Sequence, residues 1–158
     1  MIKIAVLIAC HNRKEKTIKC LYALFNQHDI EGVNLKVFLV DDGSTDGTRQ
    51  AIEELFPKVI VKEGTGNLYW ARGMSLAWQE ALKSKEKFDY YLWLNDDTCL
   101  FNTAIKELLK TQRNGAEIIV GSVCDPVTKH RTYGGLKFTN KFLTPFIKFD
   151  KSSTCAQT

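Results

Sequence analysis

Two pairs of neighbouring aspartates have the residue types and positions best suited to chemistry. Asp41 and Asp42 directly follow an apolar run, and Asp96 and Asp97 follow a second such run after one asparagine. Oxygen-rich sites of this kind suit Mg²⁺ or Mn²⁺, which bind through one or two carboxylates and complete their coordination with substrate phosphates and water. The pairs predict a divalent cation and a diphosphate ligand, although an aspartate after a strand is also an ordinary turn former and helix cap.

Further candidates lie after a glycine-bearing loop. Arg72 falls just inside an expected helix, where its guanidinium and nearby backbone donors could bind an anion, the alternative being a solvated helical arginine. Tyr69 and Trp70 are candidates for stacking on a base or sugar, whereas Trp78 and Trp93 are interpreted as core residues.

Several common site signatures are missing or incomplete. Cys10 and His11 have the types of a nucleophile and its base, but adjacent residues rarely converge, and nothing completes a triad. The histidines and cysteines show no zinc-ligand spacing. Gly64-x-Gly66 lacks the third glycine of a dinucleotide fingerprint, and there is no Walker lysine.

Alternating strand and helix patterns must position these residues, and they predict an α/β fold. Strands are expected at 2–9, 35–40, 59–61, 90–94 and 117–123. Four helices are expected: at 14–27, around Ala51, Ile52 and Leu55, after residue 67, and after Asn102 as N-cap. In the third of these, one face is expected to carry Ala71, Met74, Ser75, Trp78, Ala81 and Leu82. Residues 131–138 follow as an antiparallel strand. Because ligands of open α/β sheets bind outside the carboxyl ends of the strands, we expect both acidic pairs to face one crevice.

Length and composition limit the possible classes. The chain has 158 residues, 44% of them hydrophobic and 25% charged, which favours one globular domain. The net charge of +4 is not concentrated in a run, so nucleic-acid binding is not favoured. The apolar N-terminal segment is interpreted as a buried strand, and no apolar run is long enough to span a membrane. Five cysteines cannot all pair, which favours the cytoplasm.

Four segments in chain order resemble the inverting family 2 glycosyltransferases, which have the GT-A fold. Residues 6–13 are similar to the first strand and nucleotide loop of that family, and residues 40–48 to its second-strand signature. Residues 67–73 resemble its Asn-x-x-x-Ala-Arg-x segment, and residues 95–97 stand at its DXD-type motif with asparagine in the first place. The resemblance implies a three-layer α/β/α sandwich with a mostly parallel central sheet and a Rossmann-like nucleotide-binding half.

The resemblance also implies roles for individual residues. Asp41 would accept the imide proton of a base such as uracil, which favours a UDP-sugar donor. Asp96 would contact the ribose or the sugar, and Asp97 would coordinate Mg²⁺ or Mn²⁺ at the donor diphosphate. The complete set expected to bind the nucleotide sugar is Ala9, Asn12, Asp41, Asn67, Arg72 and Asp96.

The catalytic base is the main departure from the family. In the family it lies in an acceptor-side segment beyond a stretch similar to residues 133–135, and we expect the chain to end before it. The acidic residues after Asp97 are poor candidates: Glu107, Glu117, Asp125 and Asp150. We therefore interpret residues 1–158 as one donor-binding domain, truncated on its C-terminal side, with a βα core at 1–124 and the start of the acceptor-side region at 125–158.

The expected reaction is transfer of the sugar, with inversion, to a glycan or lipid-linked acceptor, as in polysaccharide biosynthesis. A cytoplasmic location is expected, at the inner face of the membrane if the protein associates with it peripherally. The alternative is a non-catalytic nucleotide-sugar-binding or structural module. A sugar-nucleotide pyrophosphorylase is disfavoured, because its glycine-rich loop after the first strand is replaced by residues 10–13. A phosphoacceptor receiver domain is also disfavoured, because its acidic pair would follow the first strand.

Overall fold

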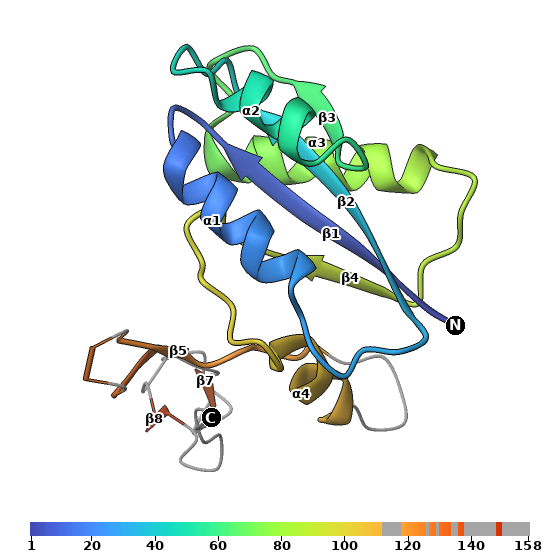
Figure 1. Ribbon diagram of the computed structural model, residues 1–158, viewed down its shortest axis with the longest axis vertical. Helices are drawn as coiled ribbons and strands as arrows, with labels where there is room; N and C mark the ends of the chain where they lie inside the picture. The colour runs from blue at the N-terminus through green and yellow to red at the C-terminus, as the bar shows by residue number, and fades with distance from the viewer. Residues whose placement is uncertain (112–117, 126, 129, 134–135, 138–147, 150–158) are drawn as a thin grey trace, which may run out of the picture. The chain divides into compact units, whose positions relative to one another are not determined.

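The computed structural model describes residues 1–111, 118–125, 127–128, 130–133, 136–137 and 148–149 (Figure 1). The chain divides into two compact units, Met1–Asn102 and Thr103–Thr158.

The first unit alternates strands and helices, as the sequence predicts. Its elements are β1 (Ile2–Cys10), α1 (Lys14–Phe25), β2 (Val33–Asp41), α2 (Thr48–Leu55), β3 (Ile60–Glu63), α3 (Tyr69–Lys83) and β4 (Tyr90–Trp93). The four strands form one parallel sheet in the order β3-β2-β1-β4. The order places the two longest strands, β1 and β2, at the centre of the sheet.

The composition of β1 explains its central position. Ala5, Val6, Leu7 and Ile8 are fully buried, although consecutive side chains point to opposite faces of a sheet. A strand that is apolar on both faces is stable only where helices cover both faces. The near-continuous hydrophobicity of this segment therefore correctly predicted a covered parallel strand.

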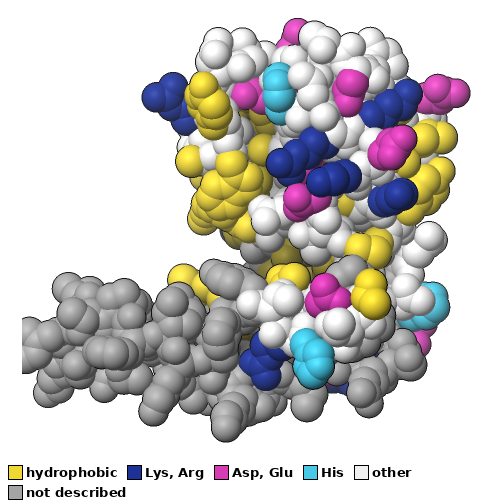
Figure 2. Space-filling view, turned by 90° about the vertical axis from the view of Figure 1, so that its left-hand side faces the viewer, with side chains coloured by type: hydrophobic (Ala, Val, Ile, Leu, Met, Phe, Trp, Pro, Cys, Tyr) yellow, Lys and Arg dark blue, Asp and Glu magenta, His cyan; other side chains and the backbone are white. Residues whose placement is uncertain are grey.

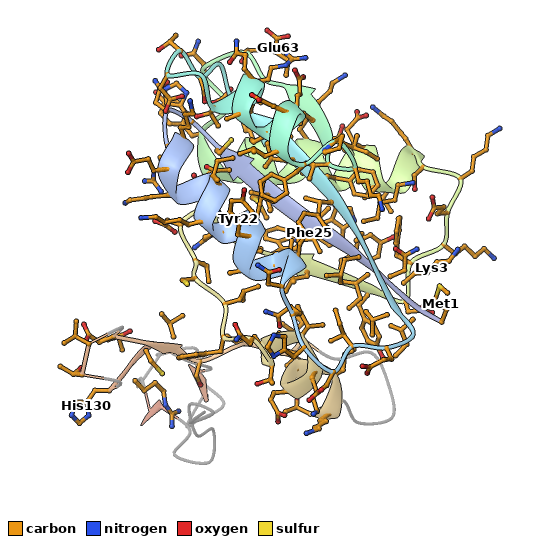
Figure 3. The ribbon with its side chains drawn as sticks, in the orientation of Figure 1. Met1, Lys3, Tyr22, Phe25, Glu63 and His130 are labelled. Carbon is orange, nitrogen blue, oxygen red and sulfur yellow. The ribbon has the colours of Figure 1, made fainter. Side chains whose placement is uncertain are left out.

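Helices cover the two faces of the sheet in three layers. Figure 1 shows α1 and α2 on one face and α3 on the other. The α3 side of the core consists of residues from β1, β2 and α3, namely Ala5, Leu7, Phe38, Val40, Met74, Ala77 and Ala81. On the other side, Tyr22 and Phe25 of α1, labelled in Figure 3, pack their rings against Phe56 at the end of α2.

A close approach between α3 and the end of β1 depends on a glycine. A Cβ atom added at Gly73 would lie 2.8 Å from the Cβ atom of Ala9, which is closer than carbon atoms can pack. Gly73 therefore lets α3 lie directly against β1 near the carboxyl edge of the sheet.

One exposed carboxylate joins the first turns of two helices. Asp46 accepts a hydrogen bond from the backbone N–H of Lys14, at the start of α1, with a distance of 3.0 Å. It also accepts hydrogen bonds from the backbone N–H and the hydroxyl of Thr48, at the start of α2. Neither helix has a side-chain cap from its own N-cap residue, so Asp46 satisfies donors that would otherwise face water.

The predicted buried face of α3 is wrong in part. Met74 and Ala81 are buried as expected, but Trp78 and Leu82 are 36% and 62% exposed. The interpretation of Trp93 as a core residue is also wrong, because it is 45% exposed. The ring of Trp78 on α3 packs against the rings of Tyr91 and Trp93 on β4, which is an edge strand of the sheet in the part of the chain that the structure describes. A strand at the edge has one neighbour, so its large side chains are covered on one flank only.

The second unit contains α4 (Ala104–Lys110) and four short strands. These are β5 (Val123–Cys124), β6 (Arg131–Tyr133), β7 (Leu136–Lys137) and β8 (Lys148–Phe149). β5 pairs with β6 and β7 pairs with β8, both antiparallel. The antiparallel strand expected from residue 131 is thus confirmed over its first residues. The predicted domain boundary at 124/125 stays a prediction.

Two expectations for this region are wrong. A fifth strand was expected over 117–123, but residues 118–122 form no strand and only Val123 lies in one, while Glu117 lies outside the described residues. Apolar composition indicates burial, but a strand also needs a partner, and Val123 and Cys124 find theirs in the antiparallel β6. Thr103 rather than Asn102 is the N-cap of α4. Within the described ranges, no helix has the length and hydropathy needed to cross a membrane.

Candidate functional site

The carboxyl edge of the parallel sheet gathers most of the predicted site residues of the first unit. Cys10 at the end of β1 is in register with Asp41 at the end of β2. The backbone N–H of Leu94 donates to the carbonyl of Leu7, which extends the β1–β4 pairing toward Asp96. In Figure 3, Glu63 marks this edge at the end of β3, and Met1 and Lys3 mark the opposite edge.

The thiol of Cys10 is buried at this edge of the sheet and lies 4.0 Å from Asp41 Oδ1. Burial raises the pKa of Cys10 far above its ordinary value, and the negative charges of Asp41 and then Asp96 raise it further. Asp41 ends β2 and Asp96 follows β4, and both parallel strands end at this edge of the sheet. A thiol with a raised pKa is a poor nucleophile, so the geometry gives no support to a catalytic cysteine at this position.

Asp42 supports a loop rather than facing the same space as the other aspartates. Its carboxylate accepts three backbone N–H groups, from Gly66 at 2.7 Å, Leu68 at 2.8 Å and Tyr69 at 3.1 Å. A Cβ atom at Gly64 would lie 2.6 Å from Asp42 Oδ1, so the loop needs glycine there. Asp42 therefore fixes residues 64–69 and caps the start of α3, whose own N-cap residue has no capping side chain.

Asp41 is buried beside Asp42 but has a different set of contacts. Its Oδ1 atom accepts the backbone N–H of Ser44 at 3.1 Å and lies 4.0 Å from the sulfur of Cys10. The expectation that both members of this pair face one crevice is thus wrong for Asp42, because the donors of the 64–69 loop engage both of its oxygens. Sequence reasoning missed this role, and the nearby glycines at 64 and 66 were its signal.

Asn12 joins the loop after β1 to the loop after β2. It has a positive φ of 49°, a conformation that asparagine tolerates better than most residues. Its Oδ1 accepts the backbone N–H of Thr45 at 2.7 Å, and its own N–H donates to the hydroxyl of Ser44 at 2.9 Å. His11 adds a second link, since its Nδ1 donates to the carbonyl of Asp42 at 2.5 Å. These bonds shape the exposed surface at the carboxyl ends of β1 and β2.

Asp96 and Asp97 converge on one cationic atom. Arg13 Nη1 lies 3.3 Å from Asp96 Oδ1 and 3.1 Å from Asp97 Oδ2. Asp96 is buried, and burial raises its pKa, while the charge of Arg13 acts in the opposite direction. The hydroxyl of Thr17 lies 3.5 Å from the second oxygen of Asp96. Sequence reasoning placed Arg13 in the nucleotide loop but missed this pairing.

The remaining predicted site residues lie around this centre. Ala9 is partly buried at the end of β1, while Asn67 and Arg72 are exposed in the 64–69 loop and the first turn of α3. The indole Nε1 of Trp70 donates to Asn95 Oδ1 at 3.0 Å. Trp70 thereby joins the start of α3 to the loop that carries Asp96 and Asp97.

Asp96 and Asp97 are the side chains at this edge whose carboxylates could hold a small divalent cation. Two oxygens from different side chains already lie within 3.3 Å of one positively charged nitrogen, so they point to a common position that a cation can take. Within the described residues, no cluster of three or more histidine, cysteine, aspartate or glutamate side chains has the arrangement of a metal site. Two carboxylates are sufficient for Mg²⁺ or Mn²⁺ where phosphates and water complete the coordination.

The described acidic residues after Asp97 have structural partners. Glu107 pairs with Lys110 one turn later in α4. Asp125 accepts hydrogen bonds from the backbone of Val127 and Thr128, which stabilises the turn after β5. Glu117 and Asp150 lie outside the described residues. The catalytic base is therefore not identified in the part of the chain that the structure describes.

Charge on the molecular surface is mixed in sign. On the face that Figure 2 shows, Lys and Arg side chains of the first unit lie among Asp and Glu side chains. A nucleic-acid surface typically gathers Lys and Arg in one patch or stripe. This face therefore does not have the charge pattern of a nucleic-acid interface.

Comparisons with known proteins agree with this architecture. The model of the family described as "Glycosyl transferase family 2" matches residues 5–157. Among solved structures, S. aureus TarS 1-349 is 20% identical with a TM-score of 0.55, and the match covers 69% of this chain and 32% of that one. The same protein in complex with UDP-GlcNAc gives 20% identity and a TM-score of 0.56, covering 69% and 30%.

These likenesses confirm the expected fold, a mostly parallel sheet between helices as in GT-A glycosyltransferases. The chain spans about a third of the length of the TarS structures that it matches. The family model covers almost the whole chain, in agreement with the four sequence segments that resemble the family. The chain belongs to glycosyl transferase family 2.

Proposed function

We propose that this chain binds the nucleotide-sugar donor of a glycosyltransferase at the carboxyl edge of its parallel sheet. The observation that carries the proposal is the convergence of Asp96 and Asp97 on one cationic position beside the ends of β1 and β2. Membership of the family supports the reaction class. The solved complexes of TarS with UDP and with UDP-GlcNAc support a uridine nucleotide donor.

The proposed contacts follow the positions of the side chains. Asp41 is buried and bonded to the backbone N–H of Ser44, and its carboxylate is suited to accept a hydrogen bond from the imide N–H of a pyrimidine base. Arg72, exposed in the first turn of α3, carries the positive charge that a diphosphate attracts. The full proposed set is Ala9, Asn12, Asp41, Asn67, Arg72 and Asp96 for the nucleotide sugar, with Asp97 for the metal.

Mg²⁺ or Mn²⁺ held by Asp97, with Asp96 next to it, would neutralise the charge that develops on the leaving diphosphate and so favour the transition state. The protein side chains have separate tasks. Burial and the Thr17 hydroxyl hold the Asp96 carboxylate in place. The Trp70 indole, bonded to Asn95, holds the loop that carries both aspartates.

The acceptor side of the reaction is also part of the proposal. Inversion requires a carboxylate base that deprotonates the acceptor hydroxyl while it attacks the anomeric carbon from the face opposite the leaving group. We place this base outside the described residues. We propose that the acceptor is a glycan or is linked to a lipid, and that the reaction takes place in the cytoplasm or at the inner face of a membrane.

Calorimetry with nucleotides tests the donor site. UDP is titrated into the chain with Mn²⁺ and with EDTA, alongside GDP, CDP and ADP at the same concentrations. We expect UDP to bind more tightly than the other nucleotides and more tightly with Mn²⁺ than with EDTA. Asp97→Asn should remove the effect of Mn²⁺, whereas Asp89→Asn, on a carboxylate that bonds to Lys3 at the opposite edge, should not. Equal binding of UDP by all variants and conditions would refute the metal assignment, and binding of no nucleotide would refute the donor site.

A further inference from the structure

Arg13 forms the link between the loop after β1 and the loop after β4. Its Nη1 atom donates to Asp96 Oδ1 and Asp97 Oδ2, at 3.3 and 3.1 Å. The backbone of Arg13 is fixed, because its carbonyl accepts the N–H of Thr17 in the first turn of α1. The side chain is half exposed, so the guanidinium can move without disturbing the core.

The contact places a positive charge at the position that the two carboxylates offer to a cation. The Thr17 hydroxyl lies near one oxygen of Asp96, Oδ2, and Arg13 contacts the other oxygen, Oδ1. A divalent cation bound to the same oxygen would lie within a few ångströms of the guanidinium, and like charges at that distance repel strongly. The guanidinium and a divalent cation therefore exclude each other from this position.

We propose that Arg13 is an internal counter-ion that a divalent cation must displace from Asp96 and Asp97, and that the released guanidinium then binds the donor diphosphate. The inference rests on the proposed donor site and adds a residue and an order of events to it. In the free protein, Arg13 offsets one of the two negative charges of the acidic pair and weakens metal binding. A diphosphate offers the displaced arginine a new anionic partner, so metal and diphosphate favour each other's binding.

Metal binding in the absence of nucleotide isolates the first half of this inference. Free Mn²⁺ is measured by electron paramagnetic resonance while the full chain is titrated with MnCl₂. We expect Arg13→Gln and Arg13→Ala to bind Mn²⁺ about 3- to 10-fold more tightly than the wild type, the range expected for loss of a partly exposed ion pair with two carboxylates. Arg13→Lys, which keeps a competing charge, should stay near the wild-type affinity.

Arg49→Gln is the matched control. Arg49 also bonds to two carboxylates, those of Glu53 and Glu63, and its loss changes the net charge by the same amount. If Arg13→Gln binds Mn²⁺ no more tightly than Arg49→Gln, or if it binds none, the counter-ion role is wrong. Circular dichroism verifies that each variant is folded.

Titration of UDP tests the second half and separates it from the proposed function. In the wild type we expect Mn²⁺ to strengthen UDP binding, and in Arg13→Gln we expect this coupling to fall about fivefold or more. Unchanged coupling in Arg13→Gln would overturn the transfer of the guanidinium to the diphosphate. If UDP binds to no variant, the proposed donor site fails, while the Mn²⁺ titration still decides whether Arg13 competes with a cation.

Discussion

Replacing Asp42 with asparagine should destabilise the first unit more than any other isosteric change of an aspartate in it. The carboxylate accepts N–H groups from Gly66, Leu68 and Tyr69, and an asparagine presents one oxygen and one NH₂ group in the same space. In the better of its two orientations, the NH₂ group faces the N–H of Gly66, and the oxygen keeps the other two donors as neutral bonds.

The magnitude follows from these bonds. One part-buried N–H, that of Gly66, loses its acceptor and faces another donor, which costs about 1–3 kcal/mol, and two charge-assisted bonds become neutral, which costs roughly 1 kcal/mol more. We therefore expect a loss of about 2–4 kcal/mol in the free energy of unfolding. With a urea m-value of about 2 kcal/mol/M, the midpoint should fall by about 1–2 M.

Tryptophan fluorescence in urea is a suitable assay, because Trp70, Trp78 and Trp93 all lie in the first unit. Asp89→Asn is the control, since its exposed carboxylate accepts one N–H, and the amide oxygen can keep that bond. Hydrogen exchange should also show that the amides of residues 66, 68 and 69 lose protection in Asp42→Asn. Equal midpoints for the two variants, or unchanged exchange at these amides, would refute the assigned role of Asp42.

Three more perturbations have expected outcomes. Gly73→Ala should lower the free energy of unfolding by about 1–3 kcal/mol, and with it the urea midpoint, because the new methyl group overlaps Ala9, although alanine has the better helix propensity. An unchanged midpoint would mean that α3 shifts freely. Iodoacetamide at pH 8, read by peptide mass spectrometry, should modify the exposed Cys99 at least about tenfold faster than the buried Cys10, whose pKa is raised, and equal rates would contradict that burial. The pKa of Asp46 is lowered below 3.8 by a threonine hydroxyl and backbone donors, so its contribution to stability is present at neutral pH and is lost as the pH falls through the lowered value. The difference in urea midpoint between wild type and Asp46→Ala should therefore be largest near pH 7 and shrink below pH 4, and a constant difference would argue against an ionised carboxylate as the acceptor.

The sequence was sufficient to predict the parallel sheet and the edge at which the site lies. Strands β1 and β2 are apolar on both faces, and only a sheet covered on both sides accommodates such segments. Because parallel strands end at one edge, the positions of Asp41 and Asp96 after their strands were enough to place them together. This part of the inference needed no knowledge of side-chain contacts.

The roles of individual carboxylates could not be predicted in the same way. Asp41 and Asp42 are identical in type and adjacent in sequence, yet Asp42 holds three N–H groups of a loop that begins over twenty residues later. The pairing of Arg13 with Asp96 and Asp97 spans more than eighty residues. Such contacts depend on the direction in which the loops leave the sheet, and local residue patterns do not predict that direction.

The aromatic residues show a second limit. Trp78 and Trp93 are large apolar residues of the type found in cores, and their rings do pack together, but Trp93 lies in the edge strand β4 and Trp78 packs against it from α3, so both stay partly exposed. Hydrophobicity indicates that a side chain packs against something. It does not indicate how many sides of it are covered.

The strand order has a consequence for synthesis on the ribosome. β1 lies at the centre of the sheet, and it pairs with β2 soon after both have been made, but its other edge pairs with β4, where Ile4 lies beside Tyr90. At roughly 5–20 residues per second, more than eighty residues take several seconds to translate. During that time one edge of a highly apolar strand has unpaired backbone groups, which can template aggregation. We therefore expect the nascent chain to depend on chaperones more than the finished protein does.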